Sequence, residues 1–370
     1  MQAAPRRQRM KWSLALAALL IPLGGCISAS HTETNDCFVN NVKVPCSTVG
    51  EVGVAAPKVD ARQTLDALKQ FSAAFPYRQS GSPTHLAARD DLAARFKAAG
   101  LEVVREGFPS GKQGLPVVGG HALEYGGENV IGVKWGSDRT HFIVVGAHYD
   151  VTEGAVYGTY DDGSGTAMVF KLAEAFAKVP TNRTILFVQF DQEELGLVGS
   201  RYLLNQTEIG KFPLPGAVDG MIDLDMVGIT WPHPAKLVVW QNSPSLKARI
   251  QVLANGTGMP ADHLLFRKTL GGSSDGQTFL DANIPTAYLW SDWDEYILPD
   301  GSALPRTGAP GVGGYASAYP WWHKADTYDT MVLSAGDEKT LQAGFQTTLD
   351  IVSPLLLDMT RPAFALDTDQ

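Results

Sequence analysis

The sequence predicts a three-layer α/β fold, in which a largely parallel, mixed sheet is covered by helices on both faces. From about residue 59 onward, short runs of β-branched and aromatic residues alternate with segments in which apolar residues recur at helical spacing. Strands that alternate with helices form βαβ units, and their helices cover both faces of a parallel sheet. Polar residues follow three of these strands directly, which is where sites form in open α/β sheets.

The individual elements follow from the same patterns. Helical spacing of apolar residues predicts helices over residues 60–75, 83–99, 164–178, 199–205, 245–256 and 335–358. Runs typical of strands cover residues 101–108, 130–135, 142–147, 184–190, 221–224, 237–240 and 286–290. Residues 291–320 are expected to form a long loop. Since the sequence has no visible repeat or second compositional domain, we expect one domain over residues 58–362.

The N-terminal residues are expected to be a targeting signal rather than part of this domain. Four cationic residues precede an apolar stretch, residues 12–23, which is short for a membrane span. The stretch ends in Leu-Gly-Gly-Cys26, which resembles the lipobox of bacterial lipoproteins. We therefore expect a signal peptide over residues 1–25, a lipid anchor at Cys26 and a polar tether over residues 26–57. An ordinary signal peptide with a coincidental cysteine is the alternative. The residue after Cys26 is not a recognised retention signal, so the periplasmic side of the outer membrane is expected.

Two further cysteines lie in the expected tether. Cys37 and Cys46 flank two valine-containing arms joined by an Asn-Asn turn signal at positions 40–41. A Cys37–Cys46 disulfide that closes a small hairpin is expected in an oxidising envelope. Two free thiols, or one nucleophilic thiol, are the alternative, although no apolar strand leads into either cysteine.

The composition is that of a folded globular chain. Of 370 residues, 44% are hydrophobic and 19% charged, which excludes a disordered or fibrous chain. The 39 acidic residues outnumber the 30 basic ones and give a formal charge of −9. This balance argues against nucleic acid as a partner, because phosphate binding needs clustered lysine and arginine.

Side chains that can bind metal follow three expected strands. The strands at 142–147, 184–190 and 221–224 lead into His148 and Asp150, into Glu193 and Glu194, and into Asp225, respectively. An Asp161-Asp162-Gly-Ser-Gly segment precedes an expected helix, and His323 lies in a Trp-Trp-His-Lys-Ala-Asp segment near the C-terminus. Three independent strands that each deliver such a side chain to one edge of the sheet indicate a metal site. A helix cap, an acidic turn and a structural histidine are the simpler readings of the single motifs.

Taken in order, these motifs resemble the co-catalytic zinc exopeptidases. The set is His-x-Asp, Asp-Asp-Gly-Ser-Gly, Glu-Glu-Leu-Gly-Leu-x-Gly-Ser, Asp-Met-x-Gly and His-x-x-Asp-Thr, and it spans residues 148–327. The group includes bacterial leucyl aminopeptidases, aminopeptidase Y and the catalytic domain of glutamate carboxypeptidase II. The resemblance implies a zinc metallo-aminopeptidase that hydrolyses N-terminal residues of peptide substrates.

The resemblance also implies ligands for two zinc ions. Asp161 would bridge both ions, with Glu194 and His323 on one and His148 and Asp225 on the other. Carboxylate and imidazole are normal zinc ligands. Three carboxylates and a bridging hydroxide would balance the charge of two Zn²⁺ ions.

Two further residues receive roles from the resemblance. Glu193 would be the general base for the metal-bridging water. Asp150 would hydrogen-bond the second ring nitrogen of His148 and fix its tautomer.

Two departures from the peptidase pattern keep a second reading open. Trp322 stands before the last histidine where several aminopeptidases have tyrosine, and this resembles the glutaminyl cyclases, which share the fold and use one zinc. Asp275 matches a carboxylate that cyclases use for substrate. We expect Trp322, Asp275 and Trp290 to contact substrate. A single-zinc glutaminyl-peptide cyclotransferase is the alternative, although the Asp-Asp-Gly-Ser-Gly loop is typical of the peptidases.

The sequence also contains features of two other classes of protein, a serine hydrolase and a binding protein without catalysis. Residues 272–276 match the G-x-S-x-G nucleophile elbow, and Ser274, Asp294 and His323 follow in the order of an α/β-hydrolase triad. No buried strand leads into this segment, as an elbow requires. The second alternative class is a metal-dependent binding lipoprotein without catalysis. The presence of both glutamates at 193–194 argues against this class.

Overall fold

The computed structural model describes most of the expected domain. It describes residues 36–39, 42–45, 54–108, 126–208, 210–229, 236–267, 274–292, 296–297, 303–304, 319, 321–323 and 325–368. The expected signal peptide and Cys26 lie outside these residues. Over the described ranges, no helix has both the length and the apolarity that a membrane span requires.

A mixed sheet of eight strands forms the centre of the domain, in the order β3-β4-β6-β5-β7-β10-β8-β9. Its strands are β3 (Glu102–Phe108), β4 (Gly127–Lys134), β5 (Asp138–His148), β6 (Arg183–Phe190), β7 (Ala217–Leu224), β8 (Lys236–Gln241), β9 (Leu264–Arg267) and β10 (Thr286–Asp292). Strands β6, β5, β7 and β10 run parallel to one another, whereas β3, β4 and β8 introduce antiparallel pairs. The predicted mixed sheet is confirmed.

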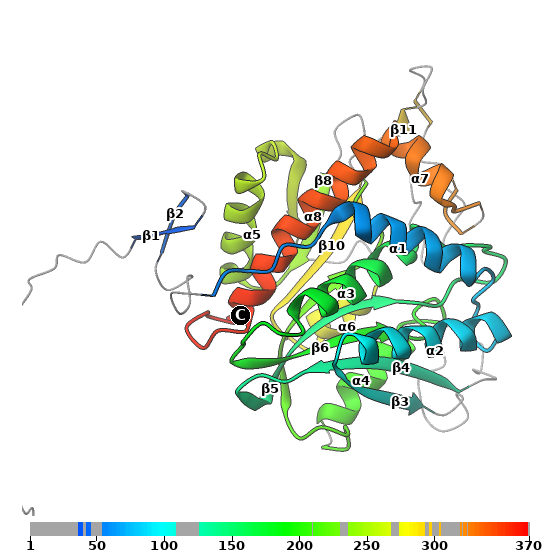
Figure 1. Cartoon of the computed structure of the whole chain (residues 1–370). Helices are drawn as coiled ribbons and strands as arrows, with labels where there is room; N and C mark the ends of the chain where they lie inside the picture. Colours follow the sequence, from blue (N-terminus) through cyan, green and yellow to red (C-terminus); the bar gives the residue numbers. More distant parts are fainter. Residues whose placement is uncertain are drawn as a thin grey trace, which may run out of the picture. The chain divides into compact units, whose positions relative to one another are not determined.

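Helices cover both faces of the sheet (Figure 1). They are α1 (Ala61–Ala74), α2 (Pro83–Ala98), α3 (Gly163–Phe176), α4 (Val198–Glu208), α5 (Pro244–Gly256), α6 (Asp275–Asp281), α7 (Tyr328–Ala335) and α8 (Glu338–Met359). Buried residues of α1, α2, α3, α5 and α8 pack into one apolar cluster with the sheet, and those of α4 and α6 pack into a second cluster. The molecule therefore has the three-layer architecture that the sequence predicts.

The C-terminal region differs from the single helix predicted over residues 335–358. Gly336 adopts a φ of 94° after α7, a conformation that favours glycine and ends the helix there. The side chain of Asp337 then caps α8 by accepting a hydrogen bond from the backbone of Thr340. Helix α6 and strand β9 were also not predicted, because both are short and lack a clear apolar period.

The sheet register brings the ends of the central strands to one edge. His148 pairs with Phe190 across β5 and β6, and Gly146 pairs with Asp223 across β5 and β7. Helix α3 begins against the same edge, because a Cβ atom at Gly165 would lie only 1.8 Å from the carbonyl oxygen of Leu224. Only glycine permits this approach.

A small antiparallel hairpin lies in the region expected to be the tether. Strand β1 (Asp36–Val39) pairs with β2 (Val42–Pro45), as predicted from the turn signal between them. Cys46 lies outside the described residues, so the Cys37–Cys46 disulfide stays a prediction.

Candidate metal centre

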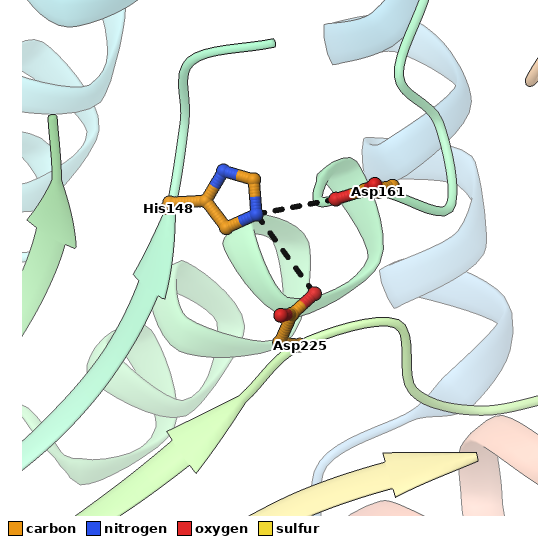
Figure 2. A group of neighbouring side chains, drawn as sticks. All are labelled: His148, Asp161 and Asp225. Atoms are coloured by element: carbon orange, nitrogen blue, oxygen red, sulfur yellow. Dashed lines mark ion pairs between the residues drawn. The ribbon is translucent and has the colours of Figure 1, made fainter. Parts of the chain in front are cut away.

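Three ligand-type side chains from three different elements face one point. His148 ends strand β5, Asp225 follows β7 and Asp161 precedes α3. The Nε2 atom of His148 lies 3.2 Å from Asp161 Oδ1 and 3.8 Å from Asp225 Oδ1 (Figure 2). Within the described part of the chain, His148 Nε2 and Asp225 Oδ1 are buried without a hydrogen-bond partner. Such atoms are rare in folded proteins, and a cation between them would satisfy both.

A second group shares Asp161 with the first. The Nε2 atom of His323 lies 2.9 Å from Asp161 Oδ2 and 3.4 Å from Glu194 Oε1. The side chain of His323 is 28% exposed, whereas that of His148 is 1% exposed. The two oxygens of one carboxylate therefore face two groups of ligand atoms, one deeply buried and one open to solvent. The structure thus brings together all five residues that the resemblance implied as metal ligands.

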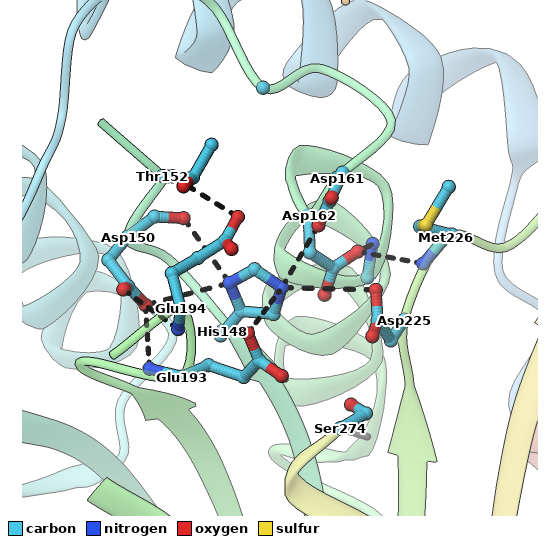
Figure 3. A network of polar contacts seen from close by, with 12 residues as sticks. His148, Asp150, Thr152, Asp161, Asp162, Glu193, Glu194, Asp225, Met226 and Ser274 are labelled. Carbon is cyan, nitrogen blue, oxygen red and sulfur yellow. Dashed lines mark hydrogen bonds and ion pairs between the residues drawn. The ribbon is translucent and has the colours of Figure 1, made fainter. Parts of the chain in front are cut away.

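The adjacent glutamates point in different directions, as expected where a strand ends. Glu193 Oε2 lies 3.9 Å from His148 Nε2. Glu194 instead points toward His323, and its Oε1 accepts a hydrogen bond from the backbone of Thr152 at 3.1 Å. Gln192, which precedes them, has a φ of 61°, so the chain turns sharply after β6. Figure 3 shows the ring of His148 between these glutamates and the aspartates of the first group.

Asp150 acts on its neighbours in a way that the sequence did not indicate. The Nδ1 atom of His148 lies 3.2 Å from the backbone carbonyl oxygen of Asp150 and 3.5 Å from its carboxylate. The carboxylate instead accepts hydrogen bonds from the backbone N–H groups of Glu193 and Glu194, at 3.1 and 3.3 Å. The carbonyl can therefore fix a proton on Nδ1, which leaves the Nε2 lone pair for a ligand. The carboxylate fixes the turn that carries both glutamates.

The charge of the site fits divalent cations. Burial, together with the charges of Asp161 and Asp223, raises the pKa of Asp225 to about 8, although His148 opposes this shift. Burial also raises the pKa of Glu193 well above its ordinary range, and Glu194 and Asp225 add to that effect. These carboxylates lack enough positive charge around them, and a bound cation would supply it.

The backbone of Asp161 is held by a residue far away in the sequence. Asp326 accepts hydrogen bonds from the backbone N–H groups of Tyr160 and Asp161, each at 2.8 Å. The hydroxyl of Tyr319 donates to the other oxygen of Asp326 at 2.9 Å. Through these contacts, Asp326 positions the backbone of Asp161.

Two buried residues near the site, Arg78 and His85, have supporting roles that no sequence pattern indicates. Arg78 is fully buried, and its guanidinium donates to the carbonyl oxygens of Tyr149, Tyr157 and Gly158. The Nε2 atom of His85 lies 2.7 Å from Asp191 Oδ1, just after the end of β6. Both residues fix strand ends and loops that carry ligands. Pattern alone cannot distinguish a lone arginine in a loop, or a lone histidine in a helix, from surface residues.

The three residues predicted to contact substrate lie in different surroundings. The indole N–H of Trp322 donates to Asp161 Oδ2. Asp275 is fully buried at the start of α6. Trp290 stacks on Trp240 with a centroid separation of 5.3 Å. Contact of these residues with substrate stays a prediction.

The G-x-S-x-G segment has no catalytic arrangement in the described residues. The hydroxyl of Ser274 is buried and donates to Asp223 Oδ2 at 2.8 Å. Asp294, the predicted acid of that triad, lies outside the described residues. His323 belongs to the group around Asp161.

Comparison with known sequences gives a family and several relatives. The family model of peptidase family M28 matches residues 129–343. Aminopeptidase YwaD of Bacillus subtilis is 31% identical over 174 residues, which cover 45% of this chain and 36% of that protein. Leupeptin-inactivating enzyme 1 of Streptomyces exfoliatus is 30% identical over 225 residues, 59% of this chain and 45% of that protein. The chain therefore spans less than half the length of these curated relatives.

Solved structures share the fold at low sequence identity. A zinc aminopeptidase from Bacillus subtilis matches with a TM-score of 0.62 and 18% identity, covering 83% of this chain and 96% of that one. A glutaminyl cyclase from Bacteroides thetaiotaomicron, bound to N-acetylhistamine, matches with a TM-score of 0.58 and 19% identity, covering 81% and 99%. Both kinds of enzyme have this architecture, so the fold alone does not separate them.

A buried polar network supports the end of β6 from the edge of the sheet. The side chain of Asn129 accepts a hydrogen bond from the backbone of Asp191 at 3.1 Å and donates to the carbonyl oxygen of Gly199 at 2.9 Å. It also donates to Glu106 Oε2 at 2.8 Å. Burial raises the pKa of Glu106 to about 7, although this hydrogen bond opposes the shift.

This pKa predicts a pH dependence of stability. Folded Glu106 keeps its proton to a higher pH than unfolded Glu106, so the folded chain binds more protons between pH 4.5 and about 7. The free energy of unfolding therefore falls as the pH rises through this window. Glu106→Gln should remove that contribution, which has a slope of at most roughly 1.4 kcal/mol per pH unit. Denaturant unfolding at several pH values measures it.

The matched control is Glu102→Gln on the same strand, where the side chain is exposed. It should keep the pH dependence of the unchanged protein. An equal dependence in Glu106→Gln and the unchanged protein would contradict the assignment.

Proposed function

Because the chain belongs to peptidase family M28, we propose that it is a zinc-dependent aminopeptidase that removes N-terminal residues from peptides. One observation carries the proposal. Two groups of ligand atoms, His148, Asp161 and Asp225 on one side and Asp161, Glu194 and His323 on the other, share a single carboxylate. A buried glutamate, Glu193, lies beside them.

The five ligands would hold two zinc ions, one in each group, with Asp161 between them. When bound, such a pair polarises a peptide carbonyl and lowers the pKa of a bound water. The charges agree with this occupancy, because three carboxylates in one pocket need about that much positive charge.

Glu193 would transfer a proton from the attacking water to the leaving amine. It can accept a proton from the attacking water and donate it to the amine that leaves the scissile bond. Burial raises the pKa of Glu193, so its carboxylate is a stronger base toward the attacking water than that of an ordinary glutamate. Asp150 would keep Glu193 in position through the backbone hydrogen bond described above.

The relatives support peptides as the substrate class. Among them, the leucine aminopeptidase 2 of Trichophyton rubrum is 27% identical over 213 residues. We propose a free N-terminal amine and an apolar first residue as the features that this enzyme recognises. The acidic site favours binding of a cationic amine.

A single-zinc glutaminyl-peptide cyclotransferase is the second candidate. It is favoured by Trp322 directly before His323 and by the cyclases among the structures of the same fold. The group around His323 would hold its one zinc. Against it, the group around His148 has two buried ligand atoms that lack hydrogen-bond partners among the described residues. A peptide with N-terminal glutamine distinguishes the two reactions, since cyclisation releases ammonia and hydrolysis releases free glutamine.

Removal of the proposed base should abolish most of the activity. Glu193→Gln keeps the size of the side chain and removes its ability to accept a proton. The kcat for a leucyl chromogenic substrate should fall by about 10²- to 10⁴-fold, while the zinc content stays unchanged. Glu153→Gln, at an exposed position in the neighbouring loop, is the matched control. An unchanged kcat in Glu193→Gln would overturn the proposed mechanism.

We also propose that Cys26 carries a lipid that anchors the chain to the outer membrane on its periplasmic side. The Leu-Gly-Gly-Cys26 motif after a short apolar stretch supports this location. In a bacterial host, the unchanged chain should sediment with membranes, and Cys26→Ala should lose its lipid label. Mass spectrometry of the mature N-terminus tests the modification directly. An unmodified Cys26 in the membrane fraction would contradict the proposal.

A further inference from the structure

We propose that Trp322 is a positioning residue of the metal centre, whose indole holds the shared carboxylate of Asp161 and the ring of His323. This inference rests on the proposed two-zinc site. It assigns Trp322 a role toward the metal ligands, whereas the sequence had suggested a role toward substrate.

The first contact is a hydrogen bond to the shared carboxylate. The indole N–H of Trp322 donates to Asp161 Oδ2, the same oxygen that lies 2.9 Å from His323 Nε2. The other oxygen of Asp161 faces His148. A carboxylate serves both groups only if its plane is fixed, because rotation would move one oxygen away from its group. A donor on Oδ2 restrains that rotation.

The second contact is with the imidazole of His323, which is the more exposed of the two ligand histidines. The rings of Trp322 and His323 have centroids 3.9 Å apart and an interplanar angle of 33°. His323 has a φ of 59°, in the left-handed region that a residue with a Cβ atom rarely adopts. Such a conformation persists only where the surroundings hold it. Packing of the indole against the imidazole is one such restraint.

Trp322 is itself held in place by a closed set of contacts. Its backbone N–H donates to the carbonyl oxygen of Tyr319 at 3.1 Å. The hydroxyl of Tyr319 donates to Asp326, which in turn accepts from the backbone N–H of Asp161. The segment from Tyr319 to Asp326 therefore holds Asp161 at its backbone through Asp326 and at its side chain through Trp322.

This arrangement separates two roles for the indole. Its one N–H group is engaged by Asp161, so it is not available to a substrate oxygen while that bond persists. Removal of a partner that orients a metal ligand typically lowers metal affinity 10- to 100-fold. Removal of a substrate contact would raise KM and leave metal affinity unchanged.

The experiment measures zinc affinity of the full chain by competition with a chromogenic chelator. Trp322→Phe removes the N–H group and keeps a ring against His323. Replacement of Trp322 by β-(3-benzothienyl)alanine keeps the bicyclic shape and lacks only the N–H group, so it tests the hydrogen bond even if the phenylalanine variant packs poorly. The matched control is Trp135→Phe, because the indole of Trp135 also donates to a carboxylate, that of Glu102, at 2.8 Å on an exposed surface.

We expect both replacements of Trp322 to lower the affinity for one of the two zinc ions about 10- to 100-fold. The affinity for the other zinc ion should stay unchanged. KM at saturating zinc should match that of the unchanged protein, and Trp135→Phe should change neither quantity. Unchanged zinc affinity with a raised KM would overturn the inference and leave the proposed function intact. An unchanged chain that binds no zinc would overturn both.

Discussion

The two oxygens of Asp161 point to two different groups of ligands, and the rest of the site is arranged around this carboxylate. One oxygen lies toward the buried His148, and the other lies toward the more exposed His323. Asp326 holds its backbone and Trp322 holds its side chain. These contacts come from residues more than 160 positions later in the chain, so the geometry depends on the complete fold of the domain.

Acidic side chains gather here at a cost in electrostatic free energy. Burial and mutual repulsion raise the pKa of Asp225 and of Glu193, which means that the fold disfavours the ionised form of these carboxylates. The buried guanidinium of Arg78 interacts with the charges of other aspartates of the region, which are Asp326, Asp162, Asp150 and Asp161. It also donates hydrogen bonds to three backbone carbonyl oxygens. Two divalent cations would offset the remaining charge, which links metal binding to stability as well as to chemistry.

The sequence predicted the parts of the site that depend on local pattern. Ligands placed directly after strands at 142–147, 184–190 and 221–224 meet because parallel strands end at one edge of the sheet. Long-range contacts were not predictable in this way. Nothing in the pattern indicated that Arg78 would be buried, that the carbonyl of Asp150 would face His148, or that Trp322 would donate to Asp161. Helix α6 was missed because seven mostly polar residues show no apolar period.

The number of metal ions in each chain tests the central claim most directly, since the account requires a carboxylate that serves two ions. Elemental analysis after gel filtration, with and without added zinc, should find two zinc ions for each unchanged chain. Asp161→Ala should lose both ions, whereas Asp262→Ala, at an exposed position outside the site, should keep both. One ion for each unchanged chain, even after zinc is added back, would contradict the shared carboxylate and favour the single-zinc cyclase.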